Sequence, residues 1–214
     1  MEIKSFKNIA YEYLYDNIIN YKILPGTPIV EQEISNILGI SRTPVREALK
    51  HLEAKGLIKH IPKRGTFVNE ISMQDIEEIF AIREALESYA LKTSIHTIPN
   101  EEIEVVEKQL NSLGDKSSFE DFYESDRKLH DLIVKYGYNK RLDNILINLN
   151  AQIEKLRHIS ATIPKRLESS KQEHVEIIEA LKARNLEKTS ELLTEHIRNV
   201  KMNVLNIHNI HRSI

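Results

Sequence analysis

Apolar residues recur every three to four positions through most of the chain, and two short runs in its first third fit strands instead. The Leu-Pro-Gly segment at 24–26, Gly39 and Gly56 interrupt this part of the chain, so its elements are expected to be short. Thr43 is expected to cap a helix and Pro44 to occupy its first position. The predicted helices cover 4–21, 31–38 and 44–55, and the predicted strands cover 57–61 and 66–68, joined by a hairpin at 62–65.

From residue 74 onward the pattern is helical to the end of the chain. Only two of the six glycines, Gly114 and Gly137, lie beyond Gly65, which indicates long helices with few interruptions. The predicted helices cover 74–97, 100–112, 118–135, 139–159, 165–184 and 186–210. The chain is therefore expected to be mainly α, with a winged helix-turn-helix domain at 1–69, a short linker at 70–73 and an antiparallel all-helical domain at 74–214.

The composition argues against several classes of protein. The chain has no cysteine, so it has no disulfide framework and no thiolate chemistry, as is usual in a reducing cytoplasm. Its first twenty residues are charged and amphipathic, unlike a signal peptide. No run approaches the roughly 18 consecutive apolar residues of a membrane span. We therefore expect a cytoplasmic protein with no membrane association.

The net charge of −2 conceals an uneven distribution of charge. Between Arg42 and Arg64 there are seven lysines and arginines but only two glutamates. Such charge runs are usually solvated helix faces, so charge alone decides little. Here the basic segment covers the second helix of the predicted helix-turn-helix motif, the one that ends at residue 55, and the hairpin that follows it. This placement favours double-stranded DNA as the partner.

The start of that second helix carries side chains suited to reading DNA. In helix-turn-helix proteins the N-terminal residues of this helix meet base edges in the major groove. Arginine forms bidentate hydrogen bonds with guanine, and hydroxyl groups bind phosphate. On the hairpin, Gly65 would let the backbone approach DNA closely. The candidate contacts are Ser41, Arg42, Thr43, Pro44, Arg46, Lys63, Arg64 and Gly65.

Motifs spread over residues 5–69 support this interpretation. They are ProGly at 25–26, Glu31, LeuGlyIleSerArgThrProValArgGluAlaLeu at 38–49, Leu52, GlyLeuIle at 56–58 and ArgGlyThrPheVal at 64–68. Together they resemble the DNA-binding domain of the GntR family of bacterial regulators. The resemblance implies DNA contacts from Gln32, Ser41, Arg42, Thr43, Arg46 and Gly65. Because one copy reads only a short half-site, a homodimer on a palindromic operator is expected.

The second domain contains an aspartate and three histidines in positions that suit a metal ion. Asp126 and His130 are four residues apart and therefore share a helix face. His174 and His196 lie among apolar residues of two other predicted helices. Neutral imidazoles and a carboxylate suit Zn²⁺, Ni²⁺, Mn²⁺ or Fe²⁺, and a helical bundle can hold such a site. On spacing alone, histidines hydrogen-bonded within the core are the more common arrangement.

Five further motifs bear on this choice: ArgGluAlaLeuGlu at 83–87, AspArgLysLeuHis at 126–130, the Asn139/Leu142 pair, GluHisValGluIleIleGluAlaLeu at 173–181 and LeuThrGluHisIle at 193–197. In their order and spacing they resemble the FCD ligand-binding domain of the FadR subfamily of GntR regulators. The resemblance implies that Asp126, His130, His174 and His196 hold a divalent metal, with Zn²⁺ the leading candidate.

A metal that accepts six ligands would keep two positions for a small organic-acid effector. Arg83 is the candidate to pair with the acid, and its alternative is an ordinary ion pair with Glu87.

The sequence therefore predicts a non-enzymatic regulator, a repressor or an activator, whose operator affinity changes when a carboxylate effector binds. One alternative keeps DNA binding and makes the metal purely structural. Another is a metallohydrolase, because three histidines, an aspartate and open positions also describe a hydrolytic site. No HExxH motif supplies a general base, however. Glu173 and Glu195 adjoin ligands, but neighbours on a helix point about 100° apart.

Overall fold

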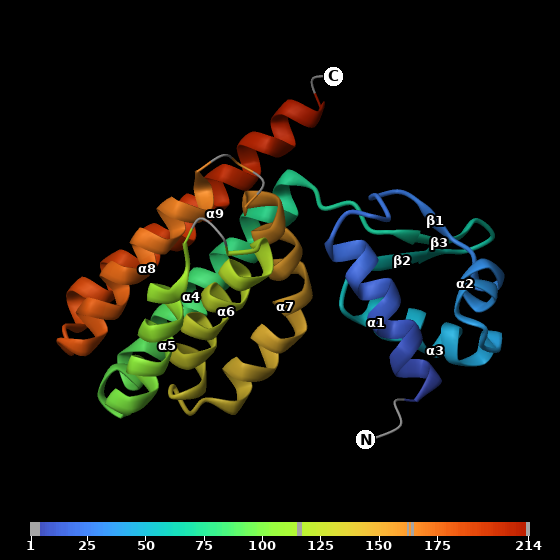
Figure 1. Cartoon of the computed structure of the whole chain (residues 1–214). Coiled ribbons are helices and arrows are strands. Elements are labelled where there is room, and N and C mark those ends of the chain that lie inside the picture. The colour runs from blue at the N-terminus through green and yellow to red at the C-terminus, as the bar shows by residue number, and fades with distance from the viewer. Residues whose placement is uncertain (1–4, 115–116, 162, 164, 213–214) are drawn as a thin grey trace. The chain divides into compact units, whose positions relative to one another are not determined.

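The computed structural model describes residues 5–114, 117–161, 163 and 165–212. The chain divides into two compact units (Figure 1). One comprises Met1–Ser72 with Asn148–Lys155, and the other comprises Met73–Ile147 with Leu156–Ile214. No helix within the described ranges is both long enough and apolar enough to cross a membrane.

The N-terminal unit is a winged helix-turn-helix, as expected. Its elements are α1 (Phe6–Ile19), β1 (Pro28–Ile29), α2 (Glu31–Leu38), α3 (Arg42–Ala54), β2 (Ile58–Ile61) and β3 (Gly65–Val68). Ser5 caps α1 by accepting a hydrogen bond from the backbone N–H of Asn8. Gly39 follows α2 with φ +64°, a left-handed conformation that glycine adopts without strain, so the chain can turn tightly into α3.

Apolar side chains from α1, α3 and the sheet form the core of this unit. Leu14 and Ile18 of α1, Val45 and Leu52 of α3, and Val68 of β3 are completely buried. Burial of each such side chain contributes about 1.5–3 kcal/mol. This core fixes the position of α3, the helix that carries four of the nine candidate DNA contacts.

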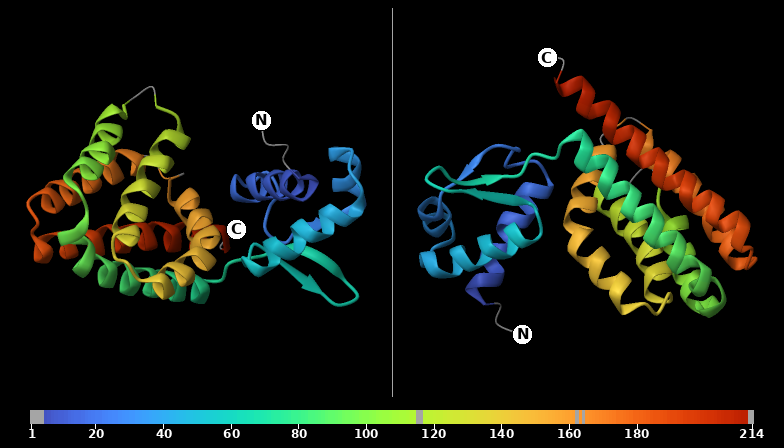
Figure 2. Two further views of the ribbon diagram at one scale, coloured as in Figure 1. Left: turned by 90° about the horizontal axis from the view of Figure 1, so that it is seen from below. Right: turned by 180° about the vertical axis from the view of Figure 1, so that it is seen from behind.

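The sheet has three antiparallel strands in the order β1-β3-β2, whereas two strands were predicted. Val68 pairs with Ile58 on one side of β3, and Phe67 pairs with Pro28 on the other. The missed strand, β1, has only two residues, too few for an alternating pattern to appear. Its proline lies at an edge of the sheet, where a missing N–H is tolerated. The β2–β3 hairpin projects from the helices as the wing (Figure 2, left).

The start of α3 differs from the prediction by two residues. Ser41, in extended conformation, is the N-cap, and the helix begins at Arg42, so Thr43 is not the cap and Pro44 is not the first helical residue. Pro44 instead takes the third position. A proline is accepted there because the first N–H groups of a helix have no intrahelical partner.

The C-terminal unit contains α4 (Met73–Thr97), α5 (Asn100–Ser112), α6 (Phe119–Lys135), α8 (Arg166–Lys182), α9 (Leu186–Arg212) and both ends of α7 (Lys140–Ala161). The middle of α7, Asn148–Lys155, belongs to the N-terminal unit. The bounds of these helices lie close to the predicted ones. Ser118 and Asp121 form a capping box that begins α6. α9 packs along α4 and α8, and α6 packs against α4, α5 and α8 (Figures 1 and 2). The inner faces of α4, α6, α8 and α9 therefore share one core.

Candidate metal centre and nucleic-acid interface

Four metal-binding side chains converge in the core of the helical unit. Asp126 and His130 extend from α6, His174 from α8 and His196 from α9, and their ligand atoms all lie within 4.8 Å of one another. The Oδ1 atom of Asp126 lies 3.2 Å from Nε2 of His174, 3.6 Å from Nε2 of His196 and 3.8 Å from Nε2 of His130. The sequence-predicted set is therefore brought together.

These separations have the right size for a central ion. Zinc binds imidazole nitrogen and carboxylate oxygen at about 2.0–2.2 Å, so neighbouring donors lie roughly 3.0 Å apart around a six-coordinate ion and roughly 3.4 Å apart around a tetrahedral one. The distance between Nε2 of His174 and Nε2 of His196 is 3.3 Å. All three histidines are almost completely buried. The donor set thus fits a divalent transition metal in both geometry and chemistry.

Two glutamates fix the orientation of two of the imidazoles. Nδ1 of His130 lies 2.6 Å from Oε2 of Glu87, and Nδ1 of His196 lies 2.6 Å from Oε2 of Glu173. An N–H donated to a carboxylate places the proton on Nδ1 and leaves the lone pair of Nε2 directed at the cluster. Carboxylate partners of this kind also raise the basicity of a metal-binding histidine.

The charges in the cluster also favour a cation. Burial lowers the pKa of His130 to about 3 and that of His174 to about 4, so both rings are neutral at pH 7. Burial alone would raise the pKa of Asp126, but Arg157 and hydrogen bonds with His174 and His196 outweigh it and hold the pKa well below its ordinary value. His130 and His174 therefore present neutral imidazoles beside an ionised carboxylate, the protonation states that metals require.

Arg83 is fully buried beside this cluster. Its Nε donates to Oε1 of Glu87 at 2.8 Å, which is the ion pair considered as the alternative to an effector contact. Its Nη2 lies 3.0 Å from Nε2 of His130, so this hydrogen bond and a metal ion would compete for one lone pair. Its Nη1 is buried without a hydrogen-bond partner in the described part of the chain.

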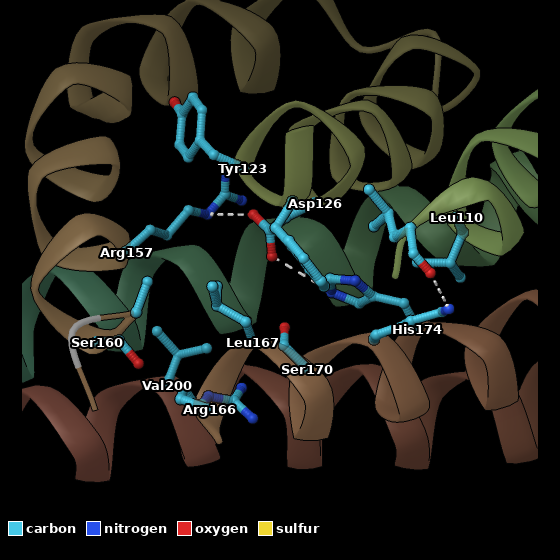
Figure 3. Close-up of a pocket in the computed structure, with 14 residues that line it drawn as sticks. Leu110, Tyr123, Asp126, Arg157, Ser160, Arg166, Leu167, Ser170, His174 and Val200 are labelled. Atoms are coloured by element: carbon cyan, nitrogen blue, oxygen red, sulfur yellow. Dashed lines mark hydrogen bonds and ion pairs between the residues drawn. The ribbon is translucent and has the colours of Figure 1, made fainter. Parts of the chain in front are cut away.

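A pocket opens next to the cluster, between α6, α7, α8 and α9 (Figure 3). Asp126 and His174 form part of its wall, with Arg157 and Ser160 of α7. Figure 3 shows Arg157 and His174 approaching the Asp126 carboxylate from opposite sides, at 3.0 Å and 3.2 Å. The cavity has about 40 Å³ of room for the centre of a water molecule. Since one water needs roughly 10–15 Å³ by this measure, the pocket suits a small polar ligand.

Three members of this site were missed or left undecided by sequence reasoning. Glu173 was considered only as a neighbour of His174, and it does not join the four ligand atoms. It instead accepts hydrogen bonds from His196, Arg166 and Asn199. Glu87 was considered only as a partner of Arg83, and Arg157 was an undecided pocket residue. The contacts of Glu87 with His130, of Arg157 with Asp126 and of Glu173 with His196 cross between helices, so periodicity along one helix gives no signal for them.

The candidate DNA contacts lie on the N-terminal unit. Ser41, Arg42 and Thr43 at the start of α3 are exposed, and Pro44 is half-buried. On the wing, Lys63 and Arg64 are exposed. Gly65 has φ +107°, a backbone conformation that side-chain-bearing residues rarely adopt. The structure therefore presents these residues to solvent at the two places where winged helix-turn-helix proteins contact DNA.

Two of the candidates have partners on α2. Nε and Nη2 of Arg46 donate to the two carboxylate oxygens of Glu31 at 2.9 Å and 2.7 Å. Gln32 donates from Nε2 to Oδ1 of Asn36 at 2.7 Å. The sequence did not indicate either pair.

Comparison with known proteins identifies both units. Residues 7–68 match the bacterial regulatory proteins of the gntR family, and residues 78–199 match the FCD domain. The HTH-type transcriptional regulator YdhC of Bacillus subtilis is 30% identical over 190 residues, which cover 87% of this chain and 85% of YdhC. The chain belongs to the GntR family of bacterial transcriptional regulators.

Solved structures share the fold of this GntR regulator. Escherichia coli McbR/YncC matches it with a TM-score of 0.77 at 21% identity, over 99% of both chains. The Zn²⁺-bound FCD domain of TM0439 matches with a TM-score of 0.58 at 23% identity, over 66% of this chain and 99% of that domain.

The gntR match and the FCD match together place the chain among the FadR-like GntR regulators, which contain an FCD domain. This assignment confirms two expectations. The GntR regulator is a DNA-binding protein, and its family is one of transcriptional regulators rather than enzymes.

Proposed function

We propose that this GntR regulator binds a palindromic operator as a homodimer and changes its operator affinity when a small carboxylate binds beside a metal held by Asp126, His130, His174 and His196. One observation carries the proposal: four ligand atoms of suitable type lie within 4.8 Å of one another in a buried core. Burying polar or ionised side chains costs free energy, so buried polar groups are usually hydrogen-bonded and buried charges are usually paired or bound to a metal.

Zn²⁺ is the proposed ion, with Ni²⁺, Mn²⁺ and Fe²⁺ as the alternatives for a site of three imidazoles and one carboxylate. The FCD domain of TM0439, which has the same fold, was solved with Zn²⁺ bound. When bound, such a metal supplies a Lewis-acidic position for a carboxylate oxygen of the effector.

The effector assignment rests on the pocket. Arg157 places a positive charge in a wall that also contains Asp126 and His174, and the Oγ atom of Ser160 is buried there without a hydrogen-bond partner in the described part of the chain. A small organic acid would satisfy both groups, since carboxylates accept charge-assisted hydrogen bonds. Arg83 remains a proposed effector contact through its Nη1, although it does not itself line the pocket.

The DNA contacts are proposed as Gln32, Ser41, Arg42, Thr43, Pro44 and Arg46 from the helices, with Lys63, Arg64 and Gly65 from the wing. Because dimeric helix-turn-helix proteins place two recognition helices about one helical turn of DNA apart, the operator would be a palindrome.

Operator binding measured with and without acids tests the proposal. Duplexes enriched by the full-length protein from a random-sequence pool would be labelled, and binding followed by fluorescence anisotropy with acetate, malonate or citrate. At least one acid is expected to change the dissociation constant about 5- to 150-fold, the usual range of allosteric coupling. Elemental analysis should find one metal per chain, and EDTA treatment should abolish the acid response. A metal-free protein that ignores every acid would contradict the proposal.

A single alanine at His174 separates sensing from a purely structural metal. If the metal only stabilises the fold, the variant should melt at a lower temperature and the unmodified protein should show no acid response. If the metal takes part in sensing, the variant should still fold and bind DNA but should no longer respond to the acid.

Replacing Glu173 by glutamine should weaken metal binding by about 10–100-fold, the usual cost of losing an outer-shell carboxylate. The carboxylate orients His196 by accepting its Nδ1–H at 2.6 Å. Competition with a chromogenic zinc chelator would measure the change. Glu176→Gln is the matched control, because Glu176 is exposed on the same helix and outside the cluster. Equal affinities of the two variants would contradict this role.

A further inference from the structure

An exposed ion pair joins α2 to the recognition helix α3. Glu31 is the first residue of α2, and Arg46 lies fifteen positions later in α3. Both carboxylate oxygens are used, by Nε and Nη2 of the guanidinium, so the contact is bidentate. The Arg46 side chain nevertheless remains 61% exposed. The arginine is thus held at one edge while most of its surface stays accessible.

The edge that Glu31 occupies leaves a second pair of donors available. A guanidinium has five N–H groups in a rigid plane. The side-on fork, formed by Nε and one hydrogen of Nη2, points at Glu31. The end-on fork, formed by Nη1 and the other hydrogen of Nη2, donates to no acceptor among the described residues. Two such donors match O6 and N7 of guanine in the major groove.

Stability does not explain the pair. Exposed ion pairs contribute only about 0–1 kcal/mol, so Glu31 adds little to folding. A carboxylate beside the start of α3 also repels the phosphates that this surface would approach. It therefore weakens binding to DNA of any sequence. Its benefit lies in orientation, because a long arginine side chain otherwise loses rotamer entropy when it binds a base.

We propose that Glu31 is a specificity-determining residue that holds the Arg46 guanidinium with its end-on fork directed at a guanine of the operator. Glu31 is a positioning residue, since it acts through Arg46 and not through a base contact of its own. The inference rests on the proposed placement of the start of α3 in the major groove.

Base preference at each operator position distinguishes this role from a structural one. Sequences would be enriched from a random duplex pool with the full-length protein, and each position of the best site then substituted in turn. Arg46→Ala should reduce discrimination at one guanine per half-site by about 5- to 150-fold. Glu31→Ala should reduce discrimination at the same guanine by about tenfold, while its affinity for scrambled DNA rises. Glu31→Gln keeps an acceptor oxygen and should fall between Glu31→Ala and the unmodified protein.

Glu33→Ala is the matched control. It removes the same charge from the same helix turn, and Glu33 is exposed and does not contact Arg46. It should strengthen binding to scrambled DNA without changing the preference for guanine. The proposal is overturned if Glu31→Ala retains the full preference, or weakens all sequences equally. If Arg46→Ala also leaves the preference intact, or if no sequence is enriched, the placement of α3 in the major groove fails together with the inference.

Discussion

His196→Ala should weaken metal binding by more than about 100-fold. Loss of an outer-shell partner already costs about 10–100-fold, and this change removes a ligand itself. The imidazole is completely buried, with Nε2 3.3 Å from Nε2 of His174 and 3.6 Å from Oδ1 of Asp126. No other donor of the described residues belongs to the cluster, so nothing would replace it. Metal per chain, measured by mass spectrometry after dialysis against buffered zinc, should fall from one to well below one.

His96→Ala controls for the loss of a histidine. His96 is exposed near the end of α4 and lies outside the cluster. Its variant should keep one metal per chain. Operator binding without effector should survive in both variants, because the proposed DNA contacts lie in the other unit. A His196→Ala protein that still holds one metal at unchanged affinity would remove His196 from the ligand set.

Much of the fold could be predicted because its signals are local. Apolar spacing near 3.6 residues and the few glycines placed every long helix of the second unit within a few residues of its observed bounds. The errors occurred where a local signal was too short or had more than one solution. β1 has only two residues, and Ser41 and Thr43 are both competent caps for α3.

The ligand set was predictable for a different reason than its surroundings. Asp126 and His130 share a helix face by spacing, and His174 and His196 were candidates because they lie among apolar residues of two other helices. Only the resemblance of their motifs to a known domain favoured a metal site over histidines hydrogen-bonded within the core. The contacts of Glu87 with His130 and of Glu173 with His196 depend on which helices are neighbours and how each is rotated. The same limit applies to Glu31 and Arg46, whose pairing requires the angle between α2 and α3.

The ion pair between Arg157 and Asp126 leads to a prediction that depends on the metal. Nε of Arg157 lies 3.0 Å from Oδ2 of Asp126, and the two side chains are only 8% and 14% exposed. Breaking a buried pair by removing one partner typically costs about 3–5 kcal/mol, because the other charge stays buried and uncompensated. Arg157→Met should therefore destabilise the metal-free protein by about this amount. Methionine keeps an unbranched apolar chain, so the loss of packing is small.

The same substitution should cost much less when the metal is bound. A divalent cation beside Asp126 then compensates the charge of the carboxylate. In the variant, this cation also no longer has the positively charged Arg157 guanidinium as a neighbour. By linkage, the variant should bind the metal more tightly than the unmodified protein, while its response to the acid effector falls because the pocket has lost a cation. Urea unfolding in EDTA and in excess zinc measures the free energy of unfolding of each protein without and with the metal. Arg127→Met is the control, because Arg127 pairs with Glu124 at a partly exposed position. An equal loss of stability with and without zinc would mean that Arg157 and the metal do not act on the same carboxylate.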